Sequence, residues 1–166
     1  MRKIQAGIGS LLFLLIAPGT VAGILPWLIS GWQFQHASLV LRGVGLALIL
    51  LGLAPLLDCV VRFAREGEGT PAPLFPVRRL IVTGYYRYVR NPMYLGLVAA
   101  IVGQALFFAD RPLLLYAVAV WLAMHGFVVI YEEPKLRQTY GSQYPVYCEH
   151  VPRWVPRRQP WVAPKA

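Results

Sequence analysis

Two short polar stretches border apolar runs in this 166-residue chain and carry most of its side chains suited to chemistry. The first, RYVRNPMY (residues 87–94), places two arginines and an asparagine directly before an apolar run. The second, YEEPKL (residues 131–136), places two adjacent glutamates directly after another one. Guanidinium groups bind carboxylates and phosphates, whereas carboxylates bind ammonium groups and hydroxyls. Brought together, the two stretches could hold a zwitterionic ligand of moderate size.

The first stretch predicts the start of a helix. Asn91 can cap free backbone N–H groups, and Pro92 stands at the first helical position, where proline is favoured. The positive end of such a helix suits an anion, and Arg87 and Arg90 stand just before it. Tyr94 should lie one turn inside.

The second stretch predicts the end of a helix, because Pro134 should bend or stop the helix that carries Glu132 and Glu133. Only Asp110 and Arg111 separate the two apolar runs between the stretches, so their helices should be antiparallel neighbours. The two stretches should then meet at one depth. A plainer interpretation is that Arg87 and Arg90 hold lipid headgroups while the glutamates merely pair with them.

The composition places these stretches in a membrane protein. Hydrophobic residues make up 57% of the chain and charged residues 14%, against about 45–50% and roughly 25% in soluble domains. We expect one all-α domain, a bundle of about four transmembrane helices over residues 8–29, 39–61, 92–109 and 112–131. A cleaved signal peptide is the rival interpretation of the first run, but that run continues too far for one.

The basic residues predict the orientation of the bundle. Of the 16 Lys and Arg residues, only Arg42 and Arg111 fall on one side of it, so both termini should be cytoplasmic. The charges do not name the membrane, which we expect to be a bacterial inner membrane. The net charge of +9 then faces anionic headgroups rather than nucleic acid, since no polar stretch is long enough for a basic binding face. Cys59 and Cys148 lack metal-ligand spacing and are expected to be packed free thiols, with no metal site.

The two stretches, with their order and separation, resemble the integral-membrane methyltransferases, which include isoprenylcysteine carboxyl methyltransferases, phospholipid N-methyltransferases and many bacterial relatives. The similarity lies in LIVTGYYRYVRNPMYLG (80–96), YEEPKL and YGSQYPVYCEHVPRWVP (140–156); the N-terminal half is similar only in being hydrophobic. The resemblance implies S-adenosylmethionine in a cytosol-facing pocket, S-adenosylhomocysteine as product, and a lipid acceptor that arrives from the bilayer. A cytosolic loop (62–91) would hold the cofactor, and a C-terminal lid (132–158) would lie in the membrane interface.

Carried over residue by residue, the resemblance implies a set of cofactor contacts, and we expect Arg90 to bind the carboxylate of the cofactor unless it serves lipid headgroups. The remaining expected contacts are Leu80, Ile81, Tyr86, Asn91, Pro92, Met93, Tyr94, Glu132 and Glu133.

The acceptor class stays open. Carboxyl methyltransferases commonly have His at the position of Asn91 and an Arg at that of Val128, whereas the aromatic tail resembles the carboxyl and bacterial branch. A carboxylate acceptor needs a cation to place it, for which Arg153 is the candidate.

An amine acceptor must first lose a proton, which draws attention to His125. This residue precedes Glu132 by seven positions and should lie on nearly the same helix face, lining the path of the acceptor. Alternatively, His125 is neutral and hydrogen-bonded to a neighbouring helix, for example to Gln104. Gly43 and Gly45 fit either close helix packing or a cofactor contact.

Two other functional classes remain possible on this sequence. One is a non-catalytic membrane protein, such as a small transporter or a partner subunit, in which the charges of the inner face are structural. The other is a family member that binds the cofactor without turnover. Neither the acceptor nor the oligomeric state follows from the sequence.

Overall fold

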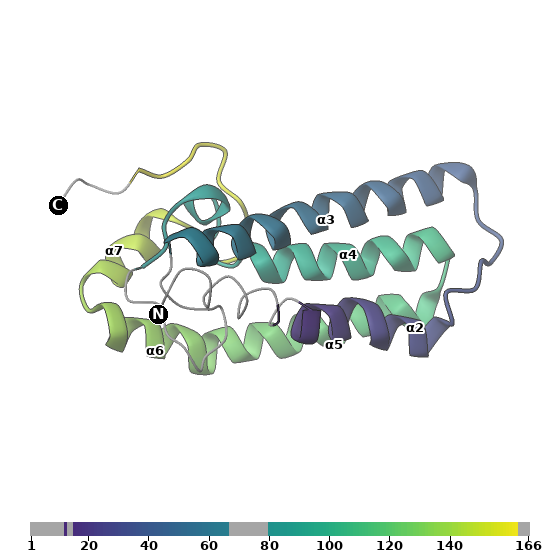
Figure 1. Cartoon of the computed structure of the whole chain (residues 1–166), viewed down its shortest axis with the longest axis horizontal. Coiled ribbons are helices and arrows are strands. Elements are labelled where there is room, and N and C mark those ends of the chain that lie inside the picture. The colour runs from purple at the N-terminus through teal and green to yellow at the C-terminus, as the bar shows by residue number, and fades with distance from the viewer. Residues whose placement is uncertain (1–11, 13–14, 67–79, 163–166) are drawn as a thin grey trace.

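The computed structural model describes residues 12, 15–66 and 80–162, and over these residues it is all-α, as expected. Figure 1 shows an elongated molecule in which α3, α4 and α5 run along the long axis, with α2 beside α5 and the short helices α6 and α7 at one end. The elements are η1 (Thr20–Ile24), α2 (Leu25–Ser30), α3 (Leu39–Glu66), η2 (Gly84–Arg87), α4 (Pro92–Phe108), α5 (Arg111–Phe127), η3 (Val128–Glu132), α6 (Glu133–Tyr140) and α7 (Gln143–His150).

Within the described part of the chain, two helices are long and apolar enough to cross a membrane: Leu39–Cys59 within α3, and the continuous helix Arg111–Tyr140 formed by α5, η3 and α6. Two shorter apolar helices, Leu15–Ser30 and Pro92–Phe108, correspond to the other two predicted spans. Most of residues 8–14 and all of 67–79 lie outside the described residues, so the start of the first span and the middle of the cytosolic loop stay predictions.

The interface between α3 and α4 is built on glycines. A Cβ atom on Gly45 would lie 2.7 Å from the carbonyl oxygen of Gly103, and a Cβ on Gly103 would lie equally close to the oxygen of Gly45. Small residues let two helix backbones approach this closely. The packing interpretation therefore holds for Gly45, whereas Gly43 faces open space.

The helix that leads to the two glutamates does not end where the sequence suggested. Pro134 occupies the first turn of α6, and helical structure runs on to Tyr140. A π-helical turn, η3, lies directly before the proline. A proline lacks the N–H for a regular i→i−4 bond and its ring crowds the preceding turn, and the wider turn here accompanies that disturbance.

The core lies toward the end of the bundle that carries the polar stretches. Cys59 of α3 and Met93 of α4 belong to a buried cluster, and Tyr86 packs against it. Both cysteines are free thiols, as expected, with Cys59 fully buried and Cys148 half-buried.

Candidate active site

The fold brings the two polar stretches together. The Tyr94 hydroxyl on α4 donates to Glu132 Oε2 at 2.9 Å. Arg90 Nη1 donates to Glu133 Oε1, also at 2.9 Å. Because α4 and α5 form a tight hairpin, the start of α4 lies at the same depth as the part of the long helix that carries Glu132 and Glu133.

Glu133 stands between two arginines. In addition to the bond from Arg90, it accepts two bonds from Arg153, Nε to Oε1 at 2.6 Å and Nη2 to Oε2 at 2.9 Å. This bidentate contact with Glu133 raises the pKa of Arg153. Arg87 takes no part in the pairing and donates instead to the Trp161 carbonyl at 2.8 Å. The pairing part of the plainer interpretation is therefore confirmed for Glu133 and Arg90, whereas the headgroup contacts expected of Arg87 and Arg90 stay a prediction.

Asn91 precedes α4 at the N-cap position, but the prediction that its side chain caps the helix is wrong. Its amide makes no cap hydrogen bond and donates instead to the Arg153 carbonyl at 3.2 Å. The next helix shows the contrast, since Asp110 accepts from the Leu113 N–H at 3.0 Å in an ordinary cap. Asn91 thus fastens the C-terminal segment to the start of α4.

That segment, residues 151–161, is called the strap below. Its backbone is bonded to the residues before α4: the Arg90 N–H donates to the Pro152 carbonyl at 2.9 Å, and the Arg157 N–H to the Tyr88 carbonyl at 3.0 Å. The predicted lid thus lies against the loop that was expected to hold the cofactor.

The aromatic residues of α7 fix the other side of this loop. The Tyr147 hydroxyl donates to the Tyr86 carbonyl at 2.7 Å, and Leu80 packs against the buried cluster of Tyr144, Tyr147 and Val151. Burial raises the pKa of Tyr147, which therefore stays a neutral donor.

The remaining expected cofactor residues lie nearby, with Pro92 and Met93 buried and Ile81 half-buried. An open hollow of about 1020 Å³ borders the loop, and none of the expected cofactor residues lines it. Its walls are Asp58, Arg62, Val82, Thr83, Gly84, Tyr85, Arg87, Tyr88, Val89, Pro156, Trp161 and Val162.

The π-turn decides which way the two glutamates face. It adds about one residue to the helical register, a rotation of roughly 100° for everything beyond it. Glu132 therefore points to Tyr94 on α4, while His125 shares its side with Glu133 rather than with Glu132. The bonds agree: Trp154 Nε1 donates to His125 Nδ1 at 3.0 Å, and Glu133 binds the preceding strap residue, Arg153.

Two expectations for His125 are corrected by these contacts. It does not share a face with Glu132, and it does not bond Gln104, whose amide binds the Ala22 carbonyl and the Trp32 indole. Trp154 and Cys148, which accepts from Arg90 Nη1 at 2.9 Å, are contacts that the sequence reasoning missed. Nothing in the sequence around Trp154 or Cys148 indicates these hydrogen bonds, because the partners come together only in the folded chain.

Comparison with known proteins agrees with the resemblance. Residues 41–143 match the phospholipid methyltransferase family, whose members are integral membrane proteins that in general use S-adenosylmethionine. The chain is also similar to protein-S-isoprenylcysteine O-methyltransferase B of Arabidopsis thaliana, with 30% identity over 118 residues. That alignment covers 68% of the chain and 57% of the relative's length. The chain belongs to the phospholipid methyltransferase family.

Proposed function

We propose that this protein is a membrane enzyme that transfers a methyl group from S-adenosylmethionine to a lipophilic acceptor dissolved in the bilayer. Family membership supports the reaction class. Four spans, made of α3, the long helix Arg111–Tyr140 and the two shorter apolar helices, would place both termini and the two polar stretches at the cytoplasmic face. The cofactor would then arrive from the cytosol and the acceptor from the bilayer.

The observation that carries the proposal is the unequal use of the two glutamates. Glu133 takes bonds from both Arg90 and Arg153, whereas among the described residues Glu132 accepts a bond only from the Tyr94 hydroxyl and pairs with no cation. Glu132 thus keeps acceptor capacity for an ammonium group or for ribose hydroxyls.

Arg90 offers the complementary group. Its Nε is buried and has no hydrogen-bond partner among the described residues, and a buried unused donor is costly. A carboxylate would satisfy it. A free acceptor on Glu132 and a free donor on Arg90 at the start of α4 are what a zwitterionic methyl donor requires, so these residues fit the cofactor.

Methyl transfer requires few further groups from the protein. The bound cofactor supplies an electrophilic methyl group, and the residues around it bind, orient and exclude water. Asn91 and Glu133 would act by holding the strap over the start of α4. Arg153 is committed to Glu133 through both Nε and Nη2, so a carboxylate acceptor would have to compete for it, whereas an amine acceptor would not.

Isothermal titration of the detergent-solubilised protein with S-adenosylhomocysteine tests the proposal. We expect binding, and we expect Glu132→Gln to weaken it at least tenfold, or about 1.4 kcal/mol. Glu149→Gln on α7 is the matched control, because that glutamate is exposed. A folded wild-type protein that binds no S-adenosylhomocysteine would favour a transporter or partner subunit instead.

A further inference from the structure

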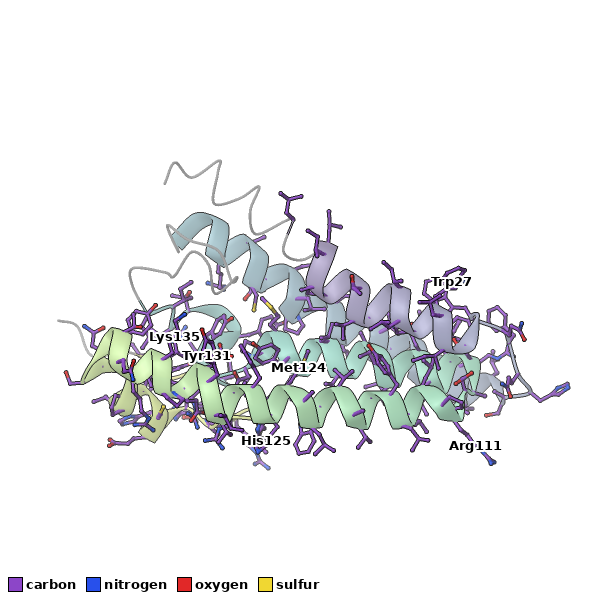
Figure 2. The ribbon with its side chains drawn as sticks, turned by 90° about the horizontal axis from the view of Figure 1, so that it is seen from below. Trp27, Arg111, Met124, His125, Tyr131 and Lys135 are labelled. Atoms are coloured by element: carbon purple, nitrogen blue, oxygen red, sulfur yellow. The ribbon has the colours of Figure 1, made fainter. Side chains whose placement is uncertain are left out.

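The strap and the long helix share a cluster of three rings: Trp121 and His125 on α5, and Trp154 of the strap. The His125 ring stacks on Trp121, with centroids 5.4 Å apart and planes 24° apart, and lies 5.8 Å from the Trp154 ring. Figure 2 shows His125 on the side of α5 turned away from the bundle, opposite Met124, which packs toward the core. In the proposed membrane arrangement, this side of α5 would meet lipid.

The bond from Trp154 fixes where the imidazole carries its proton. An indole N–H can only donate, so His125 Nδ1 must accept, and the neutral ring then holds its proton on Nε2. No described residue accepts a bond from that Nε2. A polar donor without a partner is expensive inside a bilayer, and an ionisable side chain within a span is a functional candidate by default.

The cluster is joined to the candidate active site through the strap. Trp154 follows Arg153, which Glu133 holds by two bonds and Asn91 by a third. Along the helix, His125 precedes Glu132 by seven residues, or roughly 10 Å toward the bilayer centre. A lipid that lies along the strap side of this helix, with its head beside Glu133 and Arg153, would carry its ester, amide or phosphate oxygens on the bilayer side of the methylated atom, at the level of His125.

We propose that His125 binds the lipophilic acceptor, donating a hydrogen bond from Nε2 to an acceptor oxygen that lies about 10 Å closer to the bilayer centre than the atom to be methylated. Trp154 keeps the imidazole in the donating tautomer, and the rings of Trp121 and Trp154 flank the bound oxygen. This inference rests on the proposed methyl transfer and names the residue that selects the acceptor.

Three substitutions of His125 distinguish the contribution of Nε2 from that of Nδ1. His125→Gln places an amide N–H close to the position of Nε2, His125→Asn places one close to Nδ1, and His125→Phe keeps the ring without a donor. His150→Phe is the matched control, because His150 stacks on Trp161 in nearly the same geometry, at 5.5 Å and 23°, outside the cluster. Each variant is assayed with labelled S-adenosylmethionine and two acceptors, phosphatidylethanolamine and N-acetyl-S-farnesylcysteine, and by titration with S-adenosylhomocysteine.

For whichever acceptor the wild type methylates, we expect KM for the acceptor to rise about fivefold or more in His125→Phe and His125→Asn. We expect His125→Gln to stay within about twofold of wild type, and Kd for S-adenosylhomocysteine to stay within about twofold in all variants. Unchanged KM in His125→Phe would mean that Nε2 serves only a surrounding lipid, and would overturn the inference. Equal losses in all three His125 variants, together with weaker cofactor binding, would mean a structural role for the ring and would also overturn it.

The two proposals fail in different ways. A wild type that binds S-adenosylhomocysteine but methylates neither acceptor removes the inference about His125 and leaves the cofactor site standing. A wild type that does not bind S-adenosylhomocysteine removes the proposed function itself.

Discussion

Glu133→Gln should destabilise the protein more than any other single change of a polar side chain at the inner end of the bundle. Glu133 accepts three bonds from two arginines, and its side chain is only 8% exposed, as against 11% for Arg90 and 32% for Arg153. The substitution removes the negative charge and leaves the Arg90 guanidinium buried without a counter-charge.

The magnitude follows from these exposures. Breaking a buried ion pair by removing one partner costs about 3–5 kcal/mol, whereas an exposed pair contributes roughly 0–1 kcal/mol. The Arg90 pair is largely buried and the Arg153 pair is about one-third exposed, and the amide of glutamine keeps one acceptor. We therefore expect a loss of about 3 kcal/mol, or roughly 6–12 °C in Tm at about 2–4 °C per kcal/mol for a chain of this size.

Thermal unfolding in detergent, followed by tryptophan fluorescence, measures this loss. Glu149→Gln on the exposed side of α7 is the control and should shift Tm by less than about 2 °C, since exposed substitutions stay within about 0.5 kcal/mol. The double variant Glu133→Gln with Arg153→Gln should lose less than the sum of the two single losses, because the residues share one interaction. A Glu133→Gln shift no larger than that of the control would refute the view that Glu133 holds the strap.

Two further predictions concern helix packing and helix ends. Gly45→Ala should cost about 1–3 kcal/mol, because its Cβ would meet the backbone of α4 at Gly103 and Phe107, whereas Gly43→Ala has open space and should be neutral or slightly stabilising in the same thermal assay. Equal effects at the two glycines would argue against close α3–α4 packing. Asp110→Ala should lower the free energy of unfolding by about 1 kcal/mol, because it removes the helix cap. Asn91→Ala should instead speed hydrogen exchange of the backbone amides in the strap, and unchanged exchange there would contradict the role given to Asn91.

The sequence was sufficient for features that depend on local chemistry and chain length. Pro92 marked the start of α4, and the two-residue connection to α5 required a hairpin, which is why Tyr94 and Glu132 could be expected to meet. The apolar runs also indicated where the long helices lie.

Features set by tertiary contacts were beyond the sequence. Asn91 carries a capping signal, but its side chain makes no cap bond in the fold, and its Nδ2 donates to the Arg153 carbonyl of the strap. The π-turn before Pro134 leaves no pattern either, because a helix that is apolar on most sides has no polar face from which a change of register could be read. A regular helix would put His125 on the side of Glu132, whereas the π-turn puts it on the side of Glu133, where it meets Trp154.

The most direct test is a structure of the protein in nanodiscs with S-adenosylhomocysteine bound. We expect the ligand to lie at the start of α4, with its ammonium or ribose hydroxyls within hydrogen-bond distance of Glu132 and its carboxylate on Arg90. A ligand seated instead in the open hollow between Asp58, Arg62 and Trp161, without contact to Glu132, would contradict the account.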